Sequence, residues 1–290
     1  MSVLALTATG CTLSDVEDKL RFGWPRGITD QAERMRVLWT WSWVAAFVVG
    51  ALVWGLIFYS IIFFRKKDDE LPRQTKYNLP IETIYTVLPF LIISVLFYYT
   101  AVTENFVNKE TKNPDTSVQV VAFKWNWQFD YLDKKDPTSS GAGEFVNTVG
   151  SPTEIPILVL PVGQTIRIYE KSNDVIHSFW VPEFLFKRDV VPGLDNSFEI
   201  TIKPNQTGAY VGRCAELCGT YHSMMNFEVR AVSPQDYRTY LDTLASLGGT
   251  DPNRQAEALA AIGQPTKAVT TYPFDTKRTE RAASQPPSGD

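Results

Sequence analysis

The sequence predicts an N-terminal two-helix transmembrane hairpin followed by an all-β domain. Two long segments without a charged residue, 37–64 and 83–103, predict the hairpin. From Val118 onward the chain consists of short runs rich in Val, Ile, Phe and Tyr, separated by Gly, Pro, Asn and Asp, which is typical of strands joined by turns. Most of the histidine and cysteine lies in two short segments of this second part. The sequence therefore combines a membrane anchor with a β domain that carries a concentrated set of metal ligands.

Both uncharged segments are long enough to cross a bilayer. At a rise of ~1.5 Å per residue they would extend over about 42 Å and about 31 Å, against ~30 Å of hydrocarbon. Buried helices of a soluble protein rarely give two such charge-free runs. The loop between them is rich in basic residues, which indicates a cytoplasmic loop. These residues are Arg65, Lys66, Lys67, Arg73 and Lys76. We therefore expect a multi-pass cell-membrane protein with both termini and the β domain on the outer side.

We expect four parts along the chain. They are an N-terminal segment 1–36, the hairpin 37–103, an exported domain 104–242 and a C-terminal arm 243–290. The strand spacing predicts an antiparallel sandwich or Greek-key barrel.

Two regions are expected to lie outside the β core. Residues 134–154 resemble a loop insertion, because Ser and Gly cluster at their middle. The arm from Thr243 combines an Ala-rich, helical stretch around 255–262 with a tail rich in Pro and Ser. We expect it to be a docking or disordered arm.

The odd cysteine lies near the N-terminus. Residues 6–11 resemble a bacterial lipobox, with small residues directly before Cys11, although Ala8 stands where Leu is usual and no basic segment precedes it. The resemblance implies lipidation of Cys11. An unpaired thiol is the alternative.

The other two cysteines belong to a cluster of possible metal ligands. Cys214, Cys218, His222 and Met225 follow one another at intervals of four, four and three residues, and His177 precedes them. Two thiolates, two imidazoles and a thioether form a soft ligand set that suits copper. A disulfide and a tetrahedral zinc site are alternatives. A single blue-copper centre uses one cysteine, so the second thiolate favours two copper ions.

These positions resemble the dinuclear copper A centre of the cytochrome c oxidase subunit II family. The matching residues are His177, Cys214, Glu216, Cys218, His222 and Met225. The resemblance covers about residues 37–232 and implies a cupredoxin-like Greek-key domain. It implies that the two cysteine sulfurs bridge two copper ions and that each histidine binds one of them. The thioether of Met225 and the backbone carbonyl of Glu216 complete the set. We expect the neighbouring Met224 to pack in the core.

Three further residues gain a role from the same resemblance. The Glu216 carboxylate would hold a Mg²⁺ or Mn²⁺ ion shared with subunit I, or else be a solvated acidic group. Glu82 would lie at the entrance of a proton channel, and it also suits the N-terminus of a helix. Trp125 would receive the electron from the donor. A Trp-x-Trp strand is often core packing, and Trp127 shares its face, so which of the two is exposed stays open.

The function that the resemblance implies is electron transfer. Such a subunit accepts electrons from a c-type cytochrome, soluble or tethered in a supercomplex, and passes them to haem in subunit I, where oxygen reduction is coupled to proton pumping. Subunit I, subunit III and membrane lipid would be its partners. Rival interpretations are a copper-free quinol oxidase subunit II and a membrane-tethered copper carrier. Two histidines are too few for a nitrous oxide reductase.

The net charge of the exported domain agrees with that function. Residues 104–242 contain eighteen acidic and thirteen basic residues, a net charge of −5. An acidic face would attract a positively charged cytochrome, although ordinary solubility accounts for the same charge. The exported domain contains no cluster of basic residues that would indicate nucleic-acid binding.

Overall fold

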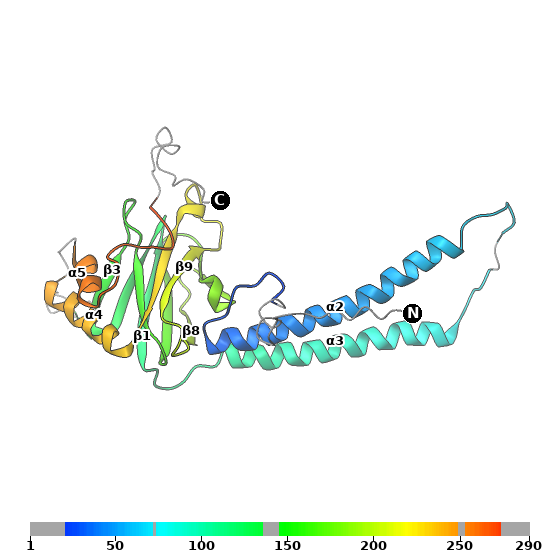
Figure 1. Cartoon of the computed structure of the whole chain (residues 1–290), viewed down its shortest axis with the longest axis horizontal. Helices are drawn as coiled ribbons and strands as arrows, with labels where there is room; N and C mark the ends of the chain where they lie inside the picture. The colour runs from blue at the N-terminus through cyan, green and yellow to red at the C-terminus, as the bar shows by residue number, and fades with distance from the viewer. Residues whose placement is uncertain (1–20, 72–73, 136–144, 249–252, 274–290) are drawn as a thin grey trace, which may run out of the picture. The chain divides into compact units, whose positions relative to one another are not determined.

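The computed structural model describes residues 21–71, 74–135, 145–248 and 253–273. They form two compact units, which we describe separately. The first contains the described residues of Met1–Trp24 and Arg34–Phe106, and the second contains those of Pro25–Glu33 and Val107–Asp290. Figure 1 shows the order of the helices and strands along the chain. The predicted fold class, two apolar helices followed by a β-sandwich, is confirmed.

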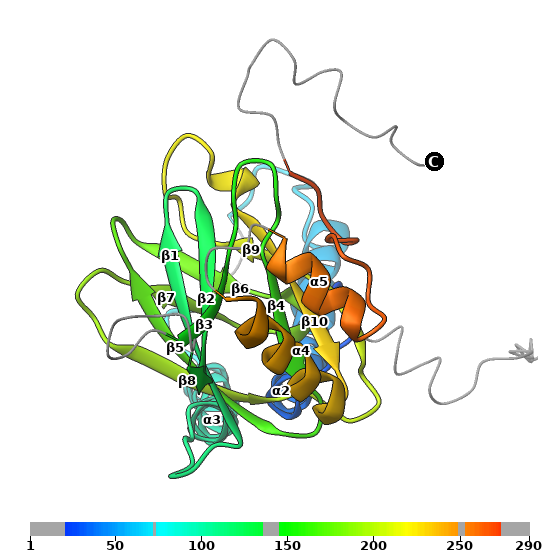
Figure 2. The same ribbon diagram turned by 90° about the vertical axis from the view of Figure 1, so that its left-hand side faces the viewer.

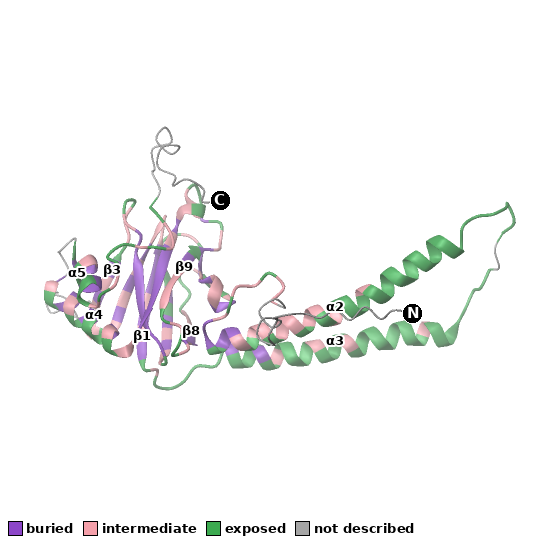
Figure 3. Ribbon diagram, viewed as in Figure 1, coloured by how far each residue is buried: buried purple, intermediate pink, exposed green. Residues whose placement is uncertain are grey.

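The two apolar helices are α2 (Asp30–Phe63) and α3 (Leu79–Val107). They contain the predicted segments 37–64 and 83–103 almost entirely, but both begin earlier and α3 also ends later. The extra residues are polar or charged in part, so hydropathy alone did not include them. In Figure 3, α3 and the C-terminal half of α2 are mostly exposed, whereas the N-terminal half of α2 is largely half-buried. Large apolar side chains such as Phe47, Trp54 and Phe97 are more than half exposed. Exposed apolar surface of this length is what a bilayer covers.

An aromatic cluster supports the start of the first unit. Trp24 stacks on Trp39 with ring centroids 4.6 Å apart, and the Trp39 indole nitrogen donates to the Arg21 carbonyl at 3.1 Å. Phe22 stacks on Trp43 at 5.8 Å. The described residues before Trp24 therefore fold back along α2.

The second unit is a sandwich of two five-stranded sheets, seen from another side in Figure 2. The first sheet has the order β3–β2–β1–β5–β8, formed by Phe145–Val149, Asn126–Lys135, Thr116–Phe123, Thr165–Ser172 and Asn196–Thr201. The second has the order β4–β10–β9–β6–β7, formed by Ile157–Pro161, Asn226–Val232, Gly208–Cys214, His177–Trp180 and Lys187–Val190.

Each sheet contains one parallel pair, which the prediction of an antiparallel sandwich did not include. β1 pairs with β5 in parallel, with Val118 opposite Ile168, and β10 pairs with β4 in parallel, with Val229 opposite Leu158. The other pairs are antiparallel. A period of two residues shows that a segment is a strand but carries no information on the direction of its neighbour.

Aromatic rings fill the space between the two sheets, next to the end of the sandwich where β6 begins and β9 ends. Phe179 stacks on Phe227 with centroids 4.7 Å apart, and Trp127 lies 5.2 Å from Phe227. All three are at most 2 % exposed. A Cβ on Gly212 would lie 2.1 Å from the Phe227 ring, so β9 requires glycine there.

The residues just before the first membrane helix belong to the β unit. Ile28 is 2 % exposed; its N–H donates to the Glu183 carbonyl at 3.0 Å and its carbonyl accepts from Lys203 N at 2.9 Å. Thr29 forms a bridge with Ile202. The segment that leads into α2 is therefore attached to the sandwich by backbone hydrogen bonds.

The C-terminal segment is part of the core as far as the second of two short helices, which contradicts the expectation of an arm outside it. Helices α4 (Pro234–Leu247) and α5 (Arg254–Ala261) contribute Leu244, Ala258 and Leu259 to the core, all 0 % exposed. The buried residues of α4 recur at helical spacing, so one apolar stripe covers the sandwich. The predicted helix around 255–262 is confirmed.

A buried ion pair attaches the chain after α5 to the sheet. Arg230 pairs with Glu228, and both are at most 1 % exposed. The second oxygen of Glu228 accepts from Val269 N at 2.7 Å and Thr270 N at 2.8 Å. Because the remaining lone pairs of this buried ion pair are satisfied, breaking it would be costly, and it fixes residues 269–270 to β10.

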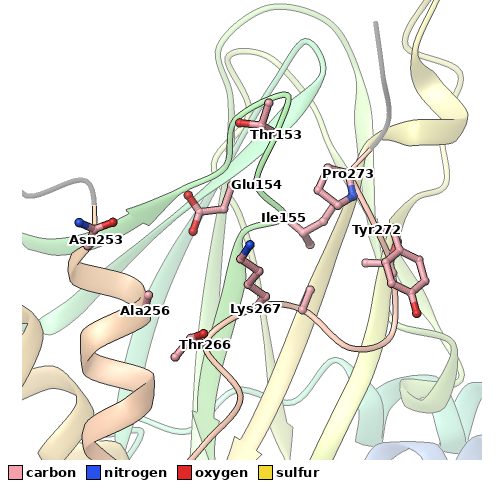
Figure 4. A pocket seen from close by; sticks show the side chains of 11 residues that line it. Thr153, Glu154, Ile155, Asn253, Ala256, Thr266, Lys267, Tyr272 and Pro273 are labelled. Carbon is pink, nitrogen blue, oxygen red and sulfur yellow. The ribbon is translucent and has the colours of Figure 1, made fainter. Parts of the chain in front are cut away.

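A cavity of about 410 Å³ lies beside this segment (Figure 4), lined by residues such as Glu154, Asn253, Lys267 and Tyr272.

The expected loop insertion 134–154 is wrong for part of its length. Residues Phe145–Val149 form β3, the edge strand next to β2. Residues 136–144, which include the Ser- and Gly-rich middle, lie outside the described residues. Asn147 and Thr148 interrupt the apolar residues of this short strand, so its hydrophobic signal was too weak to separate it from a loop.

A buried carboxyl group in this core gives a testable dependence of stability on pH. Glu170 on β5 is 4 % exposed; one of its oxygens accepts from Asn196 Nδ2 at 2.9 Å, and the other has no hydrogen-bond partner among the described residues. Burial raises its pKa from 4.5 to about 8, and the nearby Arg188 offsets this only in part. The folded protein therefore holds a proton that the unfolded chain releases.

We predict that Glu170→Gln stabilises the protein increasingly as the pH rises. Because the pKa of Glu170 is raised in the folded wild type, the contribution of its protonated carboxyl group to stability is complete below pH 4.5. This contribution is lost as the pH rises towards about 8. The wild type should lose about 2 kcal/mol from this group between about pH 6 and about pH 8, and the variant should not. Thermal unfolding of the full chain in detergent measures this. The exposed Glu257→Gln is the control, and equal pH profiles for wild type and Glu170→Gln would contradict the prediction.

Candidate metal centre

The candidate ligands meet where two neighbouring strands of the second sheet end. His177 is the first residue of β6 and Cys214 the last of β9, and Phe179 pairs with Cys214 across these antiparallel strands. The remaining candidates lie in the loop between β9 and β10. Cys214 N donates to the Met225 carbonyl at 3.1 Å and closes this loop at its base. Strand pairing therefore brings together residues that are far apart in the sequence.

The side-chain donor atoms form one compact cluster. The Cys214 and Cys218 sulfurs lie 3.8 Å apart. His177 Nδ1 is 3.9 Å from the Cys214 sulfur, and His222 Nδ1 is 3.5 Å from the Cys218 sulfur. The Met225 sulfur is 3.9 Å from that of Cys218. The structure thus places all five side-chain donors of the sequence prediction together.

The cluster suits a soft metal better than a disulfide. Both cysteines are free, and their 3.8 Å separation far exceeds the ~2.05 Å of an S–S bond. Two metal–sulfur bonds of ~2.3 Å can span that gap, so both sulfurs can bind a common metal. His177, Cys214, Cys218 and Met225 are at most 7 % exposed. A dry site of sulfur and imidazole donors fits copper.

The two thiols lie side by side, so ionisation of one opposes ionisation of the other. Burial alone would raise the pKa of Cys214, but the hydrogen bond with His177 and further hydrogen bonds lower it to about 7. Burial, followed by the charge of Cys214, raises the pKa of Cys218 to about 12. Since a metal replaces thiol protons, a bound cation would offset the repulsion between the two thiolates.

Asp174 is a functional candidate that the sequence analysis missed. Its Oδ1 lies 2.8 Å from His177 Nε2, three residues away. Burial tends to raise the pKa of Asp174, but hydrogen bonds from His177 and from two backbone N–H groups lower it. A carboxylate behind a ligand histidine is a common partner in metal sites, and an Asp three residues before the histidine was the available signal.

Glu216 presents its backbone and its side chain to different surroundings. Its carbonyl oxygen lies 3.3 Å from the Cys214 sulfur, within the cluster. Its carboxylate is 43 % exposed and lies 3.9 Å from Lys187 Nζ, which also pairs with Asp189. The carbonyl thus lies beside the sulfur atoms of the cluster, and the carboxylate lies outside it.

The neighbouring methionines Met224 and Met225 occupy different environments. Met225 is 1 % exposed, whereas Met224 is half-buried. Met224 is not part of the core cluster, so the expectation that it packs there is wrong. It lies in a short 3₁₀ turn (His222–Met224) at the surface of the loop.

The two tryptophans of the aromatic segment occupy different environments. Trp125 is half-buried in the turn between β1 and β2, and its indole nitrogen donates to the Cys218 carbonyl at 3.1 Å. Gly219 has a φ of +117°, and a Cβ there would lie 3.2 Å from the Trp125 ring. Trp127 is 0 % exposed and donates to the Met225 carbonyl at 3.2 Å. Both touch the ligand loop, but Trp125 is the more exposed.

Glu82 and Cys11 belong to other parts of the chain. Glu82 lies in the first turn of α3, and its Oε1 accepts from Asn78 N at 2.9 Å. It therefore satisfies a free N–H at the start of the helix. Cys11 lies outside the described residues, and its lipidation stays a prediction.

The fold and this cluster define a membrane-anchored β-sandwich protein with a buried site for a soft metal. Two family models match it. Residues 116–232 match the periplasmic domain of cytochrome c oxidase subunit II, and residues 19–102 match the transmembrane domain of that subunit. The chain belongs to the cytochrome c oxidase subunit II family.

Curated relatives agree with this family along nearly the whole chain. The chain is 46 % identical to the probable cytochrome c oxidase subunit 2 of Nocardia farcinica, over 99 % of this chain and 89 % of that one. It is 45 % identical to the cytochrome c oxidase subunit 2 of Mycobacterium tuberculosis strain H37Rv, over 97 % of this chain and 89 % of that one. Among solved structures, the periplasmic domain of subunit II (CoxB) of Bradyrhizobium japonicum is 26 % identical with a TM-score of 0.39, over 48 % of this chain and 100 % of that one.

Proposed function

We propose that this chain is the electron-accepting subunit of a cytochrome c oxidase and binds two copper ions in the cluster described above. The observation that supports it most directly is the pair of free, buried cysteine sulfurs 3.8 Å apart, each with a histidine nitrogen within 3.9 Å. One thiolate more than a blue-copper centre needs favours a dinuclear centre.

The ligand roles that we propose are those implied by the resemblance, and the clustering of the donors supports them. Cys214 and Cys218 would bridge the two ions, and His177 and His222 would each bind one. Met225 and the carbonyl of Glu216 would complete the set. Bound copper would supply a one-electron carrier. The chain's own contribution is to exclude water and to hold every donor on strand ends or on a loop closed by backbone hydrogen bonds, which keeps structural change small.

Trp125 is the residue through which the donor's electron would reach the copper. Its half-buried ring and its hydrogen bond to the Cys218 carbonyl connect the surface with a ligand residue. The donor is a c-type cytochrome, soluble or tethered in a supercomplex. The negative charge of the domain favours a positively charged partner.

The remaining roles concern the assembled oxidase. Subunit I, with subunit III, would receive the electron at haem and carry out oxygen reduction coupled to proton pumping. The exposed Glu216 carboxylate would hold a Mg²⁺ or Mn²⁺ ion with groups from subunit I, since one carboxylate is too few for such a cation. The basic loop between the helices would lie in the cytoplasm, with both termini and the copper domain on the outer side.

The central experiment is an electron paramagnetic resonance spectrum of the purified oxidase. We expect the wild type to show a hyperfine pattern from one electron shared over two coppers. Cys218→Ser should lose both this pattern and the ability to oxidise the donor. Met225→Leu should alter the spectrum and Met224→Leu should not, because only Met225 has its sulfur in the cluster. A single-copper pattern in the wild type would indicate a mononuclear site instead, and an absence of copper would indicate a structural subunit.

A second prediction separates the two tryptophans. Trp125→Phe should slow reduction of the copper by a reduced c-type cytochrome while the copper spectrum is retained. Trp127→Phe should instead lower the unfolding temperature, because it leaves a cavity in the core and loses a buried hydrogen bond worth about 1 kcal/mol. Stopped-flow spectroscopy measures the first effect. An unchanged rate in Trp125→Phe would assign the ring to packing alone.

Glu82→Gln tests the proton role of Glu82. The amide oxygen can still accept from Asn78 N, so the variant keeps the helix start and loses only the ionisable group. We expect slower proton uptake and turnover with normal copper reduction. Glu104→Gln, at the other end of α3, is the matched control. If turnover and proton uptake equal those of the wild type, Glu82 serves the helix terminus only.

A further inference from the structure

The Asp174 carboxylate connects three parts of the domain through short hydrogen bonds. Its Oδ1 accepts from Val175 N at 2.7 Å and lies 2.8 Å from His177 Nε2. Its Oδ2 accepts from Lys124 N at 2.7 Å, fifty residues away in the chain. Both oxygens are therefore occupied by N–H donors. Its side chain is only 26 % exposed.

The contact with His177 determines which ring nitrogen can bind a metal. A carboxylate beside Nε2 places the proton there. The lone pair then lies on Nδ1, the nitrogen 3.9 Å from the Cys214 sulfur. The His177 ring is 0 % exposed, so its N–H would lose its partner if Asp174 were removed.

The contact with Lys124 N links this histidine to the turn that carries Trp125. Consecutive residues of the turn bond to the two ligand segments: Lys124 N to Asp174, and Trp125 Nε1 to the Cys218 carbonyl at 3.1 Å. The turn is thereby held between the segment that precedes His177 and the cysteine loop. A local role in shaping the turn would involve only the hydrogen bond from Val175 N to Asp174. The contacts with Lys124 N and His177 Nε2 go beyond that role.

We infer that Asp174 is a positioning residue for electron transfer, which orients the metal ligand His177 and fixes the Lys124–Trp125 turn against the ligand loops. The inference rests on the proposed copper site. It concerns hydrogen bonds between groups of the protein itself.

The sharpest variant is Asp174→Asn. An amide has one acceptor oxygen, so it can serve the His177 side or the Lys124 side but not both. Shape and volume are almost unchanged, so the variant should fold. Asp174→Ala removes both acceptors. Asp195→Asn, on the exposed connection between β7 and β8, removes the same charge without touching a ligand and is the matched control.

The experiment uses the purified oxidase carrying each variant, with co-purification of subunit I as the check on assembly. Copper retention is titrated with a copper chelator, and the electron paramagnetic resonance spectrum is recorded. Loss of a carboxylate behind a ligand histidine typically weakens metal binding by about 10–100-fold. We expect Asp174→Asn to release copper at a correspondingly lower chelator concentration with an altered spectrum, and Asp174→Ala to be at least as severe. Asp195→Asn should behave as the wild type.

Each other outcome has a definite meaning. Equal copper retention and identical spectra in Asp174→Ala and wild type would overturn the inference. Equal weakening in Asp195→Asn would overturn it too, because the effect would then come from net charge. A wild type without a two-copper spectrum would refute the proposed function, whatever the variants do. If the wild type shows a two-copper spectrum and Asp174→Asn binds copper more weakly, the result would support both the proposed function and the role of Asp174.

Discussion

The antiparallel pairing of β6 with β9 is the interaction on which the metal centre depends. It places Phe179 opposite Cys214, and so brings the segment of His177 beside the cysteine loop. The hydrogen bond from Cys214 N to the Met225 carbonyl then closes the loop. Because both contacts are between backbone atoms, the sheet itself positions the segments that carry the ligands.

The core below the centre makes this arrangement rigid. Trp127, Phe179 and Phe227 pack as one aromatic cluster, and the Trp127 indole also holds the Met225 carbonyl. A redox site benefits from such packing, since ligands that cannot move keep similar bond lengths in both oxidation states. The same core is closed at its other side by α4 and α5, so the C-terminal segment contributes to the stability of the domain.

Much of the architecture was evident from local pattern. Charge-free length predicts the two helices, and the apolar runs of segments such as β4 and β9 predict strands. Two regions were misjudged for identifiable reasons. β3 has too weak a hydrophobic signal to stand out from a loop. The apolar stripe of α4 indicates a helix but not the surface that it covers, so its place in the core required the sandwich to be known.

The sequence by itself determined the chemistry: two cysteines, a histidine and a methionine at close intervals, with a second histidine upstream, form a soft ligand set. Only the tertiary structure decided which groups support that chemistry. Trp125 and Trp127 look equivalent in the sequence, yet one lies in a turn against Cys218 and the other inside the core. The contact between Asp174 and Lys124 N joins residues fifty positions apart. Contacts of this kind arise from strand pairing across the whole chain, which local spacing does not encode.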